Sequence, residues 1–331
     1  MIKRLGVLTS GGDSPGMNPS IRSVVRTGIG LGVEVIGIEN GYQGIFDHQF
    51  IPLGALEVSG KIRDAGTFLA TTRCMAMMQP DGPAKVVEIL KQNKLDALVV
   101  IGGDGSLTGA QKIHHLGYPV IGLPGTIDND IFGTDMGIGV DTALDTIIHS
   151  IDMIKATAAS HRRCFVIEVM GRSSGYLALM STITTGSQVA VVPEYKHNIE
   201  RIIETLNRRM QRKHNNSVIV VAEGVCTGQE FMDELLAAGR DRLDQEVRLT
   251  VLGHIQRGGS PTHFDRLLGS RMGEFAVLSL LQGETGAMVA TVGGTMRLRN
   301  FDEILGKKRA LNADAIRLAK NLGIEIGDVT E

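Results

Sequence analysis

The chain has 331 residues and a formal net charge of −2, with 43% hydrophobic and 21% charged residues. This length favours about two domains, and the composition is that of an ordinary globular protein with no electrostatic preference for nucleic acid or membrane surfaces. The three cysteines lie far apart at positions 74, 164 and 226, and no stretch is typical of a signal peptide or a membrane span, so we predict a reducing, cytoplasmic location.

Short apolar runs alternate with amphipathic stretches along the chain, which predicts alternating strands and helices. The first predicted strand, Leu5 to Leu8, precedes a glycine loop, and Asn18 is expected to cap the following helix with Pro19 at its first position. The apolar face of this helix is predicted at Ile21, Val24, Val25 and Ile29. Further strands are predicted at 33–38, 98–101, 120–123, 164–169, 190–192, 218–222, 248–253 and 288–292, and helices at 86–90, 143–154, 199–210, 264–281 and 313–322.

Two predicted strands in the middle of the chain end in loops rich in glycine and acid. The first loop contains Gly102, Gly103, Asp104 and Gly105, and the second contains Thr126, Asp128 and Asp130. In open α/β sheets such loops meet at the carboxyl edge beside a topological switch point. Glycine backbone can cradle a phosphate, and one carboxylate can hold a Mg²⁺ ion that keeps most of its waters. The pattern predicts phosphoryl transfer, with Asp104 holding the metal and Asp128 accepting a proton. Taken singly, each loop also fits a tight turn that caps the next helix.

Six motifs occur in order: Leu-Thr-Ser-Gly-Gly-Asp at 8–13, Pro-Gly-Met-Asn at 15–18, Ile-Gly-Gly-Asp-Gly-Ser at 101–106, Leu-Pro-Gly-Thr-Ile-Asp-Asn-Asp at 123–130, Val-Met-Gly-Arg at 169–172 and Leu-Gly-His-Ile-Gln-Arg-Gly-Gly-Ser-Pro at 252–261. On these motifs the chain resembles the bacterial ATP-dependent 6-phosphofructokinases, in register up to about residue 295. The tail beyond that residue shows no match and receives no predicted role.

The resemblance implies an α/β fold of two Rossmann-like three-layer lobes with mostly parallel sheets, each lobe discontinuous in sequence. The larger, ATP-binding lobe is expected at 1–139 plus 252–304, and the smaller, sugar-phosphate-binding lobe at 140–251 plus 305–331. The resemblance further implies a homotetramer that uses Mg²⁺ and transfers the γ-phosphoryl group of ATP to the 1-hydroxyl group of fructose 6-phosphate.

The resemblance also implies roles for single residues. Asp128 corresponds to the family's base, Thr126 and Arg172 to contacts with the transferring phosphoryl group, and Asp104 to the magnesium-binding acid. The ATP-binding positions match Gly12, Arg73, Cys74, Gly103, Asp104, Gly105 and Ser106. The sugar-phosphate positions match Thr126, Asp128, Met170, Gly171, Arg172, Glu223, His254 and Arg257, while Arg163 and Arg248 match arginines contributed by a neighbouring subunit.

Departures from the family pattern concern the phosphoryl donor and the effector site. Gly105 and Gly125 leave room for the α-phosphate of ATP, whereas pyrophosphate-using relatives carry an acid and a lysine there. The family's effector site takes ADP or GDP as activator or phosphoenolpyruvate as inhibitor. Its anion-binding positions are matched or nearly matched at Arg22, Arg26, Ser59 and Arg212, and Lys155 and His214 are further candidates for this site. Ala55 and Lys155 each replace an arginine, Gly60 replaces an acid and Gln188 a metal-holding glutamate, so a weak or altered effector response is predicted.

Four alternatives stay open on the sequence alone. The first is a pyrophosphate-dependent phosphofructokinase, and the second is a related kinase that phosphorylates NAD or a lipid diol. The third is a catalytically silent metabolite sensor, and the fourth is an NAD-dependent dehydrogenase, although the stretch from Gly137 to Thr142 lacks the third glycine of a dinucleotide-binding loop.

Overall fold

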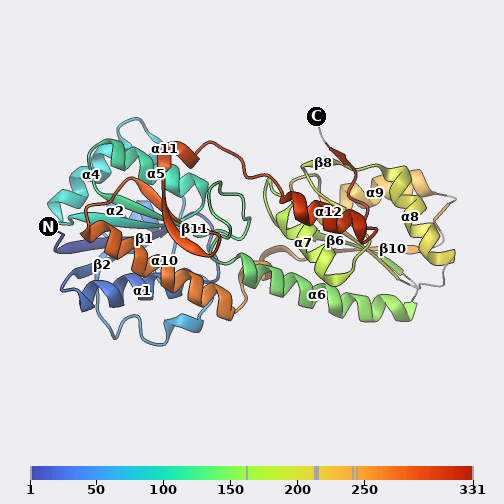
Figure 1. The fold of residues 1–331 in the computed structure, drawn as a ribbon, viewed down its shortest axis with the longest axis horizontal. Helices are drawn as coiled ribbons and strands as arrows, with labels where there is room; N and C mark the ends of the chain where they lie inside the picture. The colour runs from blue at the N-terminus through green and yellow to red at the C-terminus, as the bar shows by residue number, and fades with distance from the viewer. Residues whose placement is uncertain (1, 162, 212–215, 241, 244, 330–331) are drawn as a thin grey trace. The chain divides into compact units, whose positions relative to one another are not determined.

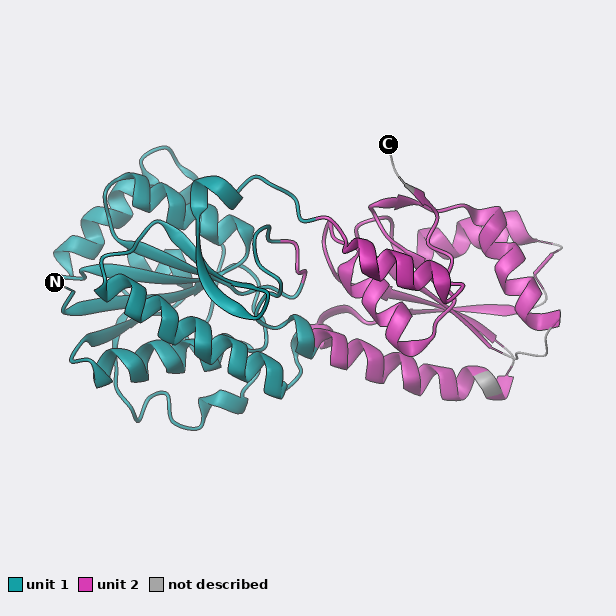
Figure 2. Cartoon of the chain, viewed as in Figure 1, with its two compact units in different colours: residues 1–127, 131–142, 257–309 teal, residues 128–130, 143–256, 310–331 magenta. Residues whose placement is uncertain are grey.

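The computed structural model describes residues 2–161, 163–211, 216–240, 242–243 and 245–329, and the chain divides into two compact units (Figures 1 and 2). Unit 1 contains residues 1–127, 131–142 and 257–309, and unit 2 contains residues 128–130, 143–256 and 310–331. Each unit is therefore built from segments that lie far apart in the sequence.

Unit 1 is built on a seven-stranded sheet. Its strand order is β12 (Thr295–Asn300), β11 (Ala287–Val292), β5 (Val120–Pro124), β4 (Ala97–Gly102), β1 (Arg4–Ser10), β2 (Glu34–Ile38) and β3 (Phe50–Leu53). All neighbours are parallel except the two edge pairs, β11 with β12 and β2 with β3. Because β2 lies on one side of β1 and β4 on the other, the strand order reverses between β1 and β4, which defines a topological switch point.

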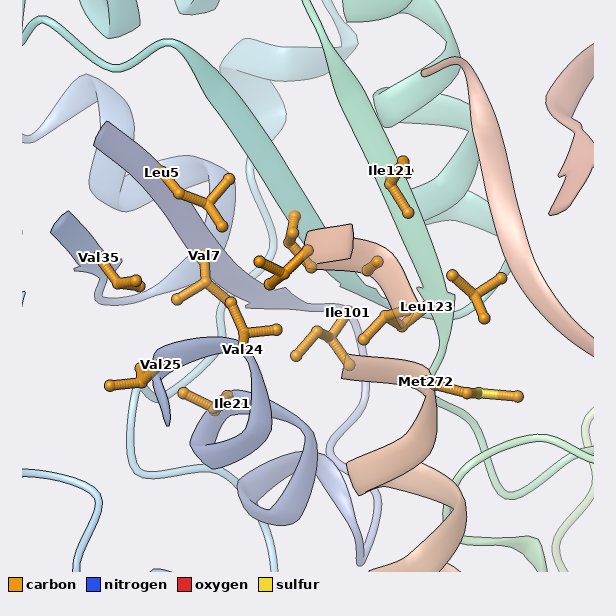
Figure 3. Packing of buried hydrophobic residues seen from close by; sticks show 14 of the residues in the cluster. Leu5, Val7, Ile21, Val24, Val25, Val35, Ile101, Ile121, Leu123 and Met272 are labelled. Carbon is orange, nitrogen blue, oxygen red and sulfur yellow. The ribbon is translucent and has the colours of Figure 1, made fainter. Parts of the chain in front are cut away.

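Helices cover both faces of this sheet because its strands are apolar on both sides. Leu5 and Val7 of β1 pack with Ile21 of α1 (Met17–Gly30) and Met272 of α10 (His263–Leu281), as Figure 3 shows. Leu8 of β1 instead joins the core on the opposite face. That second core includes residues of α2 (Gly41–Phe46), α3 (Met75–Met78), α4 (Gly82–Gln92), α5 (Asp104–His115) and α11 (Phe301–Ile304). Unit 1 is thus a three-layer α/β structure.

Unit 2 is built on a four-stranded parallel sheet. Its order is β10 (Glu246–Val251), β6 (Arg163–Val169), β9 (Ser217–Ala222) and β7 (Val189–Val191). Its helices are α6 (Val140–His161), which begins in unit 1, then α7 (Tyr176–Thr185), α8 (Ile199–Gln211), α9 (Gly228–Gly239) and α12 (Ala313–Asn321). A small pair of strands, β8 (Tyr195–Lys196) and β13 (Asp328–Val329), lies beside them. Because β6 and β10 are parallel neighbours, the loops that follow them leave the same edge of this sheet side by side.

The predicted alternation of strands and helices is confirmed, since each predicted element occurs with ends shifted by a few residues. The periodicity does not predict the helices α2, α3, α7, α9 and α11, nor the short strands β3, β8, β12 and β13. The β11–β12 hairpin has a signal that could reveal it, because Gly293 and Gly294 form its turn. Among the described residues, no helix combines the length and apolarity that a bilayer crossing requires.

The predicted start of the first helix is wrong. α1 begins at Met17 with Gly16 as its N-cap, and Asn18 makes no cap. The Asn18 side chain instead donates to the backbone oxygen of Asp64 at 3.1 Å and accepts from the amide of Phe68 at 2.9 Å. These partners are distant in sequence and hold the 64–68 segment against α1. The apolar face was also placed too far along the helix, because Ile29 is 43% exposed.

Candidate functional site

The loops after β1 and β4 meet at the switch point of unit 1. Ser10 at the end of β1 pairs with Gly102 at the end of β4. A Cβ atom on Gly102 would lie 2.4 Å from the Ser10 carbonyl oxygen and 2.6 Å from the Ser106 hydroxyl oxygen, so this approach requires glycine. Gly11 follows with a φ of 87°, in the left-handed region that glycine adopts readily. The two predicted phosphate loops are therefore neighbours.

The second motif lies beside the first, as predicted. The Gly125 amide donates to the Gly102 carbonyl oxygen at 3.0 Å. A Cβ atom on Gly103 would lie 3.9 Å from Cβ of Thr126, which places the Thr126 side chain next to the glycine loop. Thr126 is 7% exposed. The structure thus brings together the ends of β1, β4 and β5 at one edge, where ligands bind in open α/β sheets.

Two arginine-bearing segments reach the first glycine loop. The hydroxyl group of Thr71, two residues before Arg73, donates to the Gly11 carbonyl oxygen at 2.8 Å. The Arg257 guanidinium donates from Nη1 to the Asp13 carbonyl oxygen at 2.5 Å and lies against Gly12. Arg257 was predicted to bind the sugar phosphate, and here it belongs to unit 1 and contacts the loop predicted to bind ATP.

The predicted metal-binding acid stands at a helix N-terminus. Asp104 is the first residue of α5, its side chain is exposed, and its carboxylate makes no ion pair or hydrogen bond with another residue in the described part of the chain. The helix dipole favours anionic groups here. No cluster of three or more potential metal ligands occurs among the described residues. A Mg²⁺ ion held mainly by substrate phosphates and water needs only one such carboxylate, so Asp104 fits that ion.

Cys74 has a structural partner that its predicted role in ATP binding does not include. Its sulfur accepts from the Met77 amide at 3.4 Å and thereby caps α3. Partial burial raises the pKa of this thiol, so it stays protonated at neutral pH. Any contact between Cys74 and a nucleotide would therefore be made by a neutral thiol.

Asp128 is nearly buried. It is 5% exposed, and the segment 128–130 is grouped with unit 2 although it follows β5 of unit 1 by a few residues. The next residue, Asn129, adopts a φ of 50°, and it is 2% exposed. Non-glycine residues with such backbone angles are uncommon and concentrate at functional sites.

In unit 2, the loop after β6 carries Arg172 in a restrained conformation. Arg172 has a φ of 53°. Oε1 of Glu223 accepts from the amide of Arg172 at 2.9 Å and from that of Gly171 at 3.3 Å. A Cβ atom on Gly224 would lie 1.9 Å from the Arg172 carbonyl oxygen. Glu223, predicted to contact the sugar phosphate, therefore also fixes the backbone that presents Arg172, and the missing side chain of Gly224 makes room for it.

The two arginines predicted to act across a subunit interface share one carboxylate. Nε of Arg163 lies 2.7 Å from Oε2 of Glu246, and Arg248 pairs with the other oxygen of the same carboxyl group. The Arg163 guanidinium holds the pKa of Glu246 below its usual range. In the parallel pair of β6 and β10, Glu246 stands opposite Arg163 and Arg248 stands opposite Phe165, so both arginines lie in the amino-terminal halves of these strands. The structure brings them together, and their predicted action on a neighbouring subunit stays a prediction.

The predicted effector residues fall in both units. Arg22 and Arg26 on α1 and Ser59 in the following loop belong to unit 1, whereas Lys155 on α6 belongs to unit 2. Arg212 and His214 lie outside the described residues. The four described residues are thus divided between the two units, and a common effector site for all six stays a prediction.

Known proteins similar to this chain place it in a family. The profile of the phosphofructokinase family matches residues 4–280. An ATP-dependent 6-phosphofructokinase of Halalkalibacterium halodurans is 49% identical over 323 residues, which covers 98% of this chain and 100% of the relative. This chain belongs to the ATP-dependent 6-phosphofructokinase family.

Solved phosphofructokinase structures share the fold. The structure of phosphofructokinase from Saccharomyces cerevisiae matches with a TM-score of 0.85 and 33% identity, over 98% of this chain and 48% of that chain, so the present chain spans about half the length of the yeast chain. A pyrophosphate-dependent phosphofructokinase from Marinobacter aquaeolei matches with a TM-score of 0.81 at 20% identity, over 100% of this chain and 96% of that chain. The second likeness concerns the fold alone, and it shows that the phosphofructokinase fold does not itself decide the donor.

Two sequence-based expectations about the family pattern are corrected. The tail beyond residue 295 is not unmatched, because the similarity to the 6-phosphofructokinase of H. halodurans extends over 98% of the chain. The tail forms α12, whose Ile316 and Ala319 are buried in the smaller unit. Gly125 leaves no open space, because a Cβ atom there would lie 2.9 Å from the Met17 side chain and 3.1 Å from that of Ile101. Gly105, by contrast, has no atom within 4 Å of such a Cβ.

A buried carboxylate that the motifs do not indicate organises the start of α6. Asp265 on α10 is fully buried and accepts from the amides of Gly139 and Thr142, both at 2.8 Å, and from the Thr142 hydroxyl at 2.6 Å. Ile138, which precedes this turn, accepts through its carbonyl oxygen from the Thr126 amide at 3.2 Å. Asp265 thus supports the segment that pairs with Thr126 in this 6-phosphofructokinase family member. Local sequence gives no signal for these partners, because they lie more than 120 residues away.

Asp265 is expected to make stability depend on pH. Burial raises the pKa of Asp265 to about 6, whereas an unfolded aspartate titrates near 3.9. The folded chain therefore binds the proton more tightly than the unfolded chain, and protonation of Asp265 stabilises the fold. This contribution to the free energy of unfolding is complete below about pH 4 and is lost as pH rises through 6, by about 3 kcal/mol. We expect urea unfolding of the wild-type chain and Asp265→Asn to give free energies whose difference changes by that amount between pH 4 and 7. A difference independent of pH would contradict the assignment.

Proposed function

We propose that this chain transfers the γ-phosphoryl group of ATP to the 1-hydroxyl group of fructose 6-phosphate, yielding fructose 1,6-bisphosphate and ADP in glycolysis. Membership of the ATP-dependent 6-phosphofructokinase family supports the reaction class. The observation that carries the proposal is the meeting of the glycine loops after β1 and β4 with Thr126 at the switch point of the larger sheet. Converging backbone amides and a helix N-terminus can neutralise phosphate oxygens there.

In the proposed mechanism Asp128 is the base. As the oxygen of the sugar 1-hydroxyl forms a bond to the γ-phosphorus, its proton passes to the Asp128 carboxylate, and the bond from phosphorus to the leaving oxygen of ADP breaks. Thr126 and Arg172 would contact the transferring phosphoryl group. A Mg²⁺ ion at Asp104 would supply charge neutralisation of the ATP phosphates. Gly12, Arg73, Gly103, Gly105 and Ser106 would bind the rest of ATP.

The sugar phosphate would be recognised mainly by unit 2. Met170, Gly171 and Glu223 belong to its loops, together with the exposed side chain of His254. Imidazole and guanidinium groups are strong donors to a phosphate monoester, which supports roles for His254 and Arg257. Arg163 and Arg248 would be donated to a neighbouring subunit of a homotetramer, in which case oligomerisation is required for catalysis.

The phosphoryl donor is testable by comparing two assays. We expect turnover of fructose 6-phosphate with Mg²⁺ and ATP, and no measurable turnover when pyrophosphate replaces ATP, because Gly105 leaves open space beside the phosphate loop. A coupled assay for fructose 1,6-bisphosphate measures both rates. Turnover with pyrophosphate would favour the pyrophosphate-dependent alternative. If neither donor gave measurable turnover, a non-catalytic metabolite sensor would be favoured.

We also propose that the effector response is weak or altered. Two polar side chains at the expected effector positions of unit 2 are already engaged within the chain. Gln188 is 7% exposed, donates to the Gly186 carbonyl oxygen at 2.8 Å and accepts from the Val218 amide at 2.7 Å. The Lys155 ammonium donates to the Thr185 carbonyl oxygen, and burial lowers its pKa. An effector phosphate or its metal would have to displace these bonds.

The effector proposal predicts a small response to nucleotide. We expect ADP or phosphoenolpyruvate at physiological concentrations to change the apparent affinity for fructose 6-phosphate by less than about fivefold, the lower end of ordinary allosteric coupling. Initial rates measured against fructose 6-phosphate, with and without each effector, test this. Strong activation by ADP would refute the proposal.

A further inference from the structure

A glutamine that no motif role covers joins two loops of unit 2. Gln256 lies in the 3-10 helix η2 (Gly253–Arg257) and is 0% exposed. Buried polar side chains need hydrogen-bond partners, since an unpaired buried amide is costly. The partners of Gln256 therefore indicate what holds it in the core.

Both ends of the Gln256 amide are satisfied by backbone groups of different loops. Its Oε1 accepts from the Met170 amide at 3.0 Å, and its Nε2 donates to the Gly253 carbonyl oxygen at 2.9 Å. Met170 begins the loop after β6, and Gly253 begins the loop after β10. β6 and β10 are neighbours, and the Leu252 amide continues their pairing by donating to the Glu168 carbonyl oxygen at 3.2 Å. Gln256 therefore ties the two loops just beyond the last ladder bond.

Only a side chain with a donor and an acceptor on one planar group makes both bonds. A glutamate at this position would keep the acceptor for the Met170 amide. Its second carboxylate oxygen cannot donate, however, and would face the Gly253 carbonyl oxygen without a hydrogen bond. A methionine would fill the volume and leave both backbone groups without partners. The amide thus sets the distance between the two loops, and these loops carry Arg172 and His254.

We propose that Gln256 is a positioning residue that holds the loops after β6 and β10 at the spacing at which His254 binds the sugar phosphate and Arg172 contacts the phosphoryl group transferred to it. This inference rests on the proposed function for the identity of the ligand. Its physical content, a fixed spacing of two loops at the carboxyl edge of the smaller sheet, is independent of that identity. Misplacing a binding group by about 1 Å lowers efficiency by about 100-fold.

The variant Gln256→Met tests the inference. We expect the KM for fructose 6-phosphate to rise by about 10- to 100-fold, while the KM for ATP stays unchanged, because ATP is assigned to unit 1. Thr182→Val is the matched control, since Thr182 is also fully buried in unit 2 and loses one hydrogen bond, to the Ala178 carbonyl oxygen. The control is expected to keep both KM values. Gln256→Glu, which retains the bond to Met170, gives a second measurement with a KM rise in the same direction.

Two kinetic outcomes and one exchange measurement can overturn the inference, and a further result separates it from the proposed function. A wild-type KM for fructose 6-phosphate in either folded Gln256 variant overturns it, as does an equal rise in both KM values. If the wild-type chain does not use fructose 6-phosphate at all, the proposed function fails. The positioning role is then judged by hydrogen exchange of the Met170 amide, which we expect to be at least about tenfold faster in Gln256→Met. Unchanged exchange of this amide overturns the role whatever the substrate is.

Discussion

Replacing Asp128 with serine or asparagine is expected to lower kcat by about 100- to 10,000-fold, the usual contribution of a general base. Neither replacement can take the proton from the 1-hydroxyl group of the sugar. Asparagine keeps the size of the side chain, whereas serine leaves space for a water, so similar losses in both variants would point to the missing carboxylate itself. The KM values for ATP and fructose 6-phosphate should change by only a few-fold, since Asp128 acts mainly in the transition state.

Steady-state rates with saturating ATP, Mg²⁺ and fructose 6-phosphate measure this effect. Asp128 is 5% exposed, so the thermal unfolding midpoint of each variant has to be compared with that of the wild-type chain to separate catalysis from stability. A folded Asp128→Asn variant that keeps more than a tenth of the wild-type kcat would show that another group is the base.

Replacing Gly224 with alanine is expected to give the second largest effect, a fall in kcat/KM of about 100-fold. The added Cβ atom would lie 1.9 Å from the Arg172 carbonyl oxygen, a distance at which the backbone must move. Arg172 has a φ of 53° and is held there by Glu223, so movement of this peptide redirects the guanidinium group. The loss should appear in kcat as well as in the KM for fructose 6-phosphate, because Arg172 is assigned to the transferring phosphoryl group.

Gly30→Ala serves as the control for the Gly224 variant. Gly30 ends α1, and a Cβ atom there has no neighbour within 4 Å, so the added methyl group is accommodated without movement. We expect Gly30→Ala to keep the wild-type kcat/KM. If Gly224→Ala also kept it, the close approach of Gly224 would not be what fixes Arg172.

Local sequence predicts those parts of this protein that depend on local chemistry. The run from Leu98 to Ile101 is apolar at every position and becomes a strand covered on both faces, with Val99 and Ile101 in one core and Leu98 and Val100 in the other. The glycine loop after it is predicted for the same reason, since backbone that approaches Ser10 and Ser106 closely has no room for a side chain. The loop residues that follow these strands could therefore be predicted from the sequence.

Features that depend on partners far away in the sequence could not be predicted. Asn18 looks like an N-cap, but its side chain bonds to backbone 46 and 50 residues away. Gln256 and Asp265 lie inside or beside a recognised motif. Gln256 has one local partner, Gly253, but it also bonds to Met170, 86 residues away, and Asp265 bonds to Gly139, 126 residues away. Nothing in the adjacent sequence indicates these distant partners. Gly125 was predicted to leave open space, and this is wrong because Met17 and Ile101 lie beside it. Both come from other segments, so the sequence around Gly125 does not indicate them. Burial and long-range hydrogen bonds decided these positions.

The discontinuity of the larger unit has a consequence for the order in which the chain becomes folded. Ile21 and Val24 of α1 share one core with Met272 of α10, and β5 pairs with β11, so the first 127 residues cannot complete their core until residues 257–309 have been made. The four strands of the main sheet of the smaller unit come from the continuous stretch 143–256 and are made earlier during synthesis. Contacts between segments so far apart in sequence slow folding and expose apolar surface for longer. The amino-terminal part of this chain therefore depends most on protection from aggregation before synthesis ends.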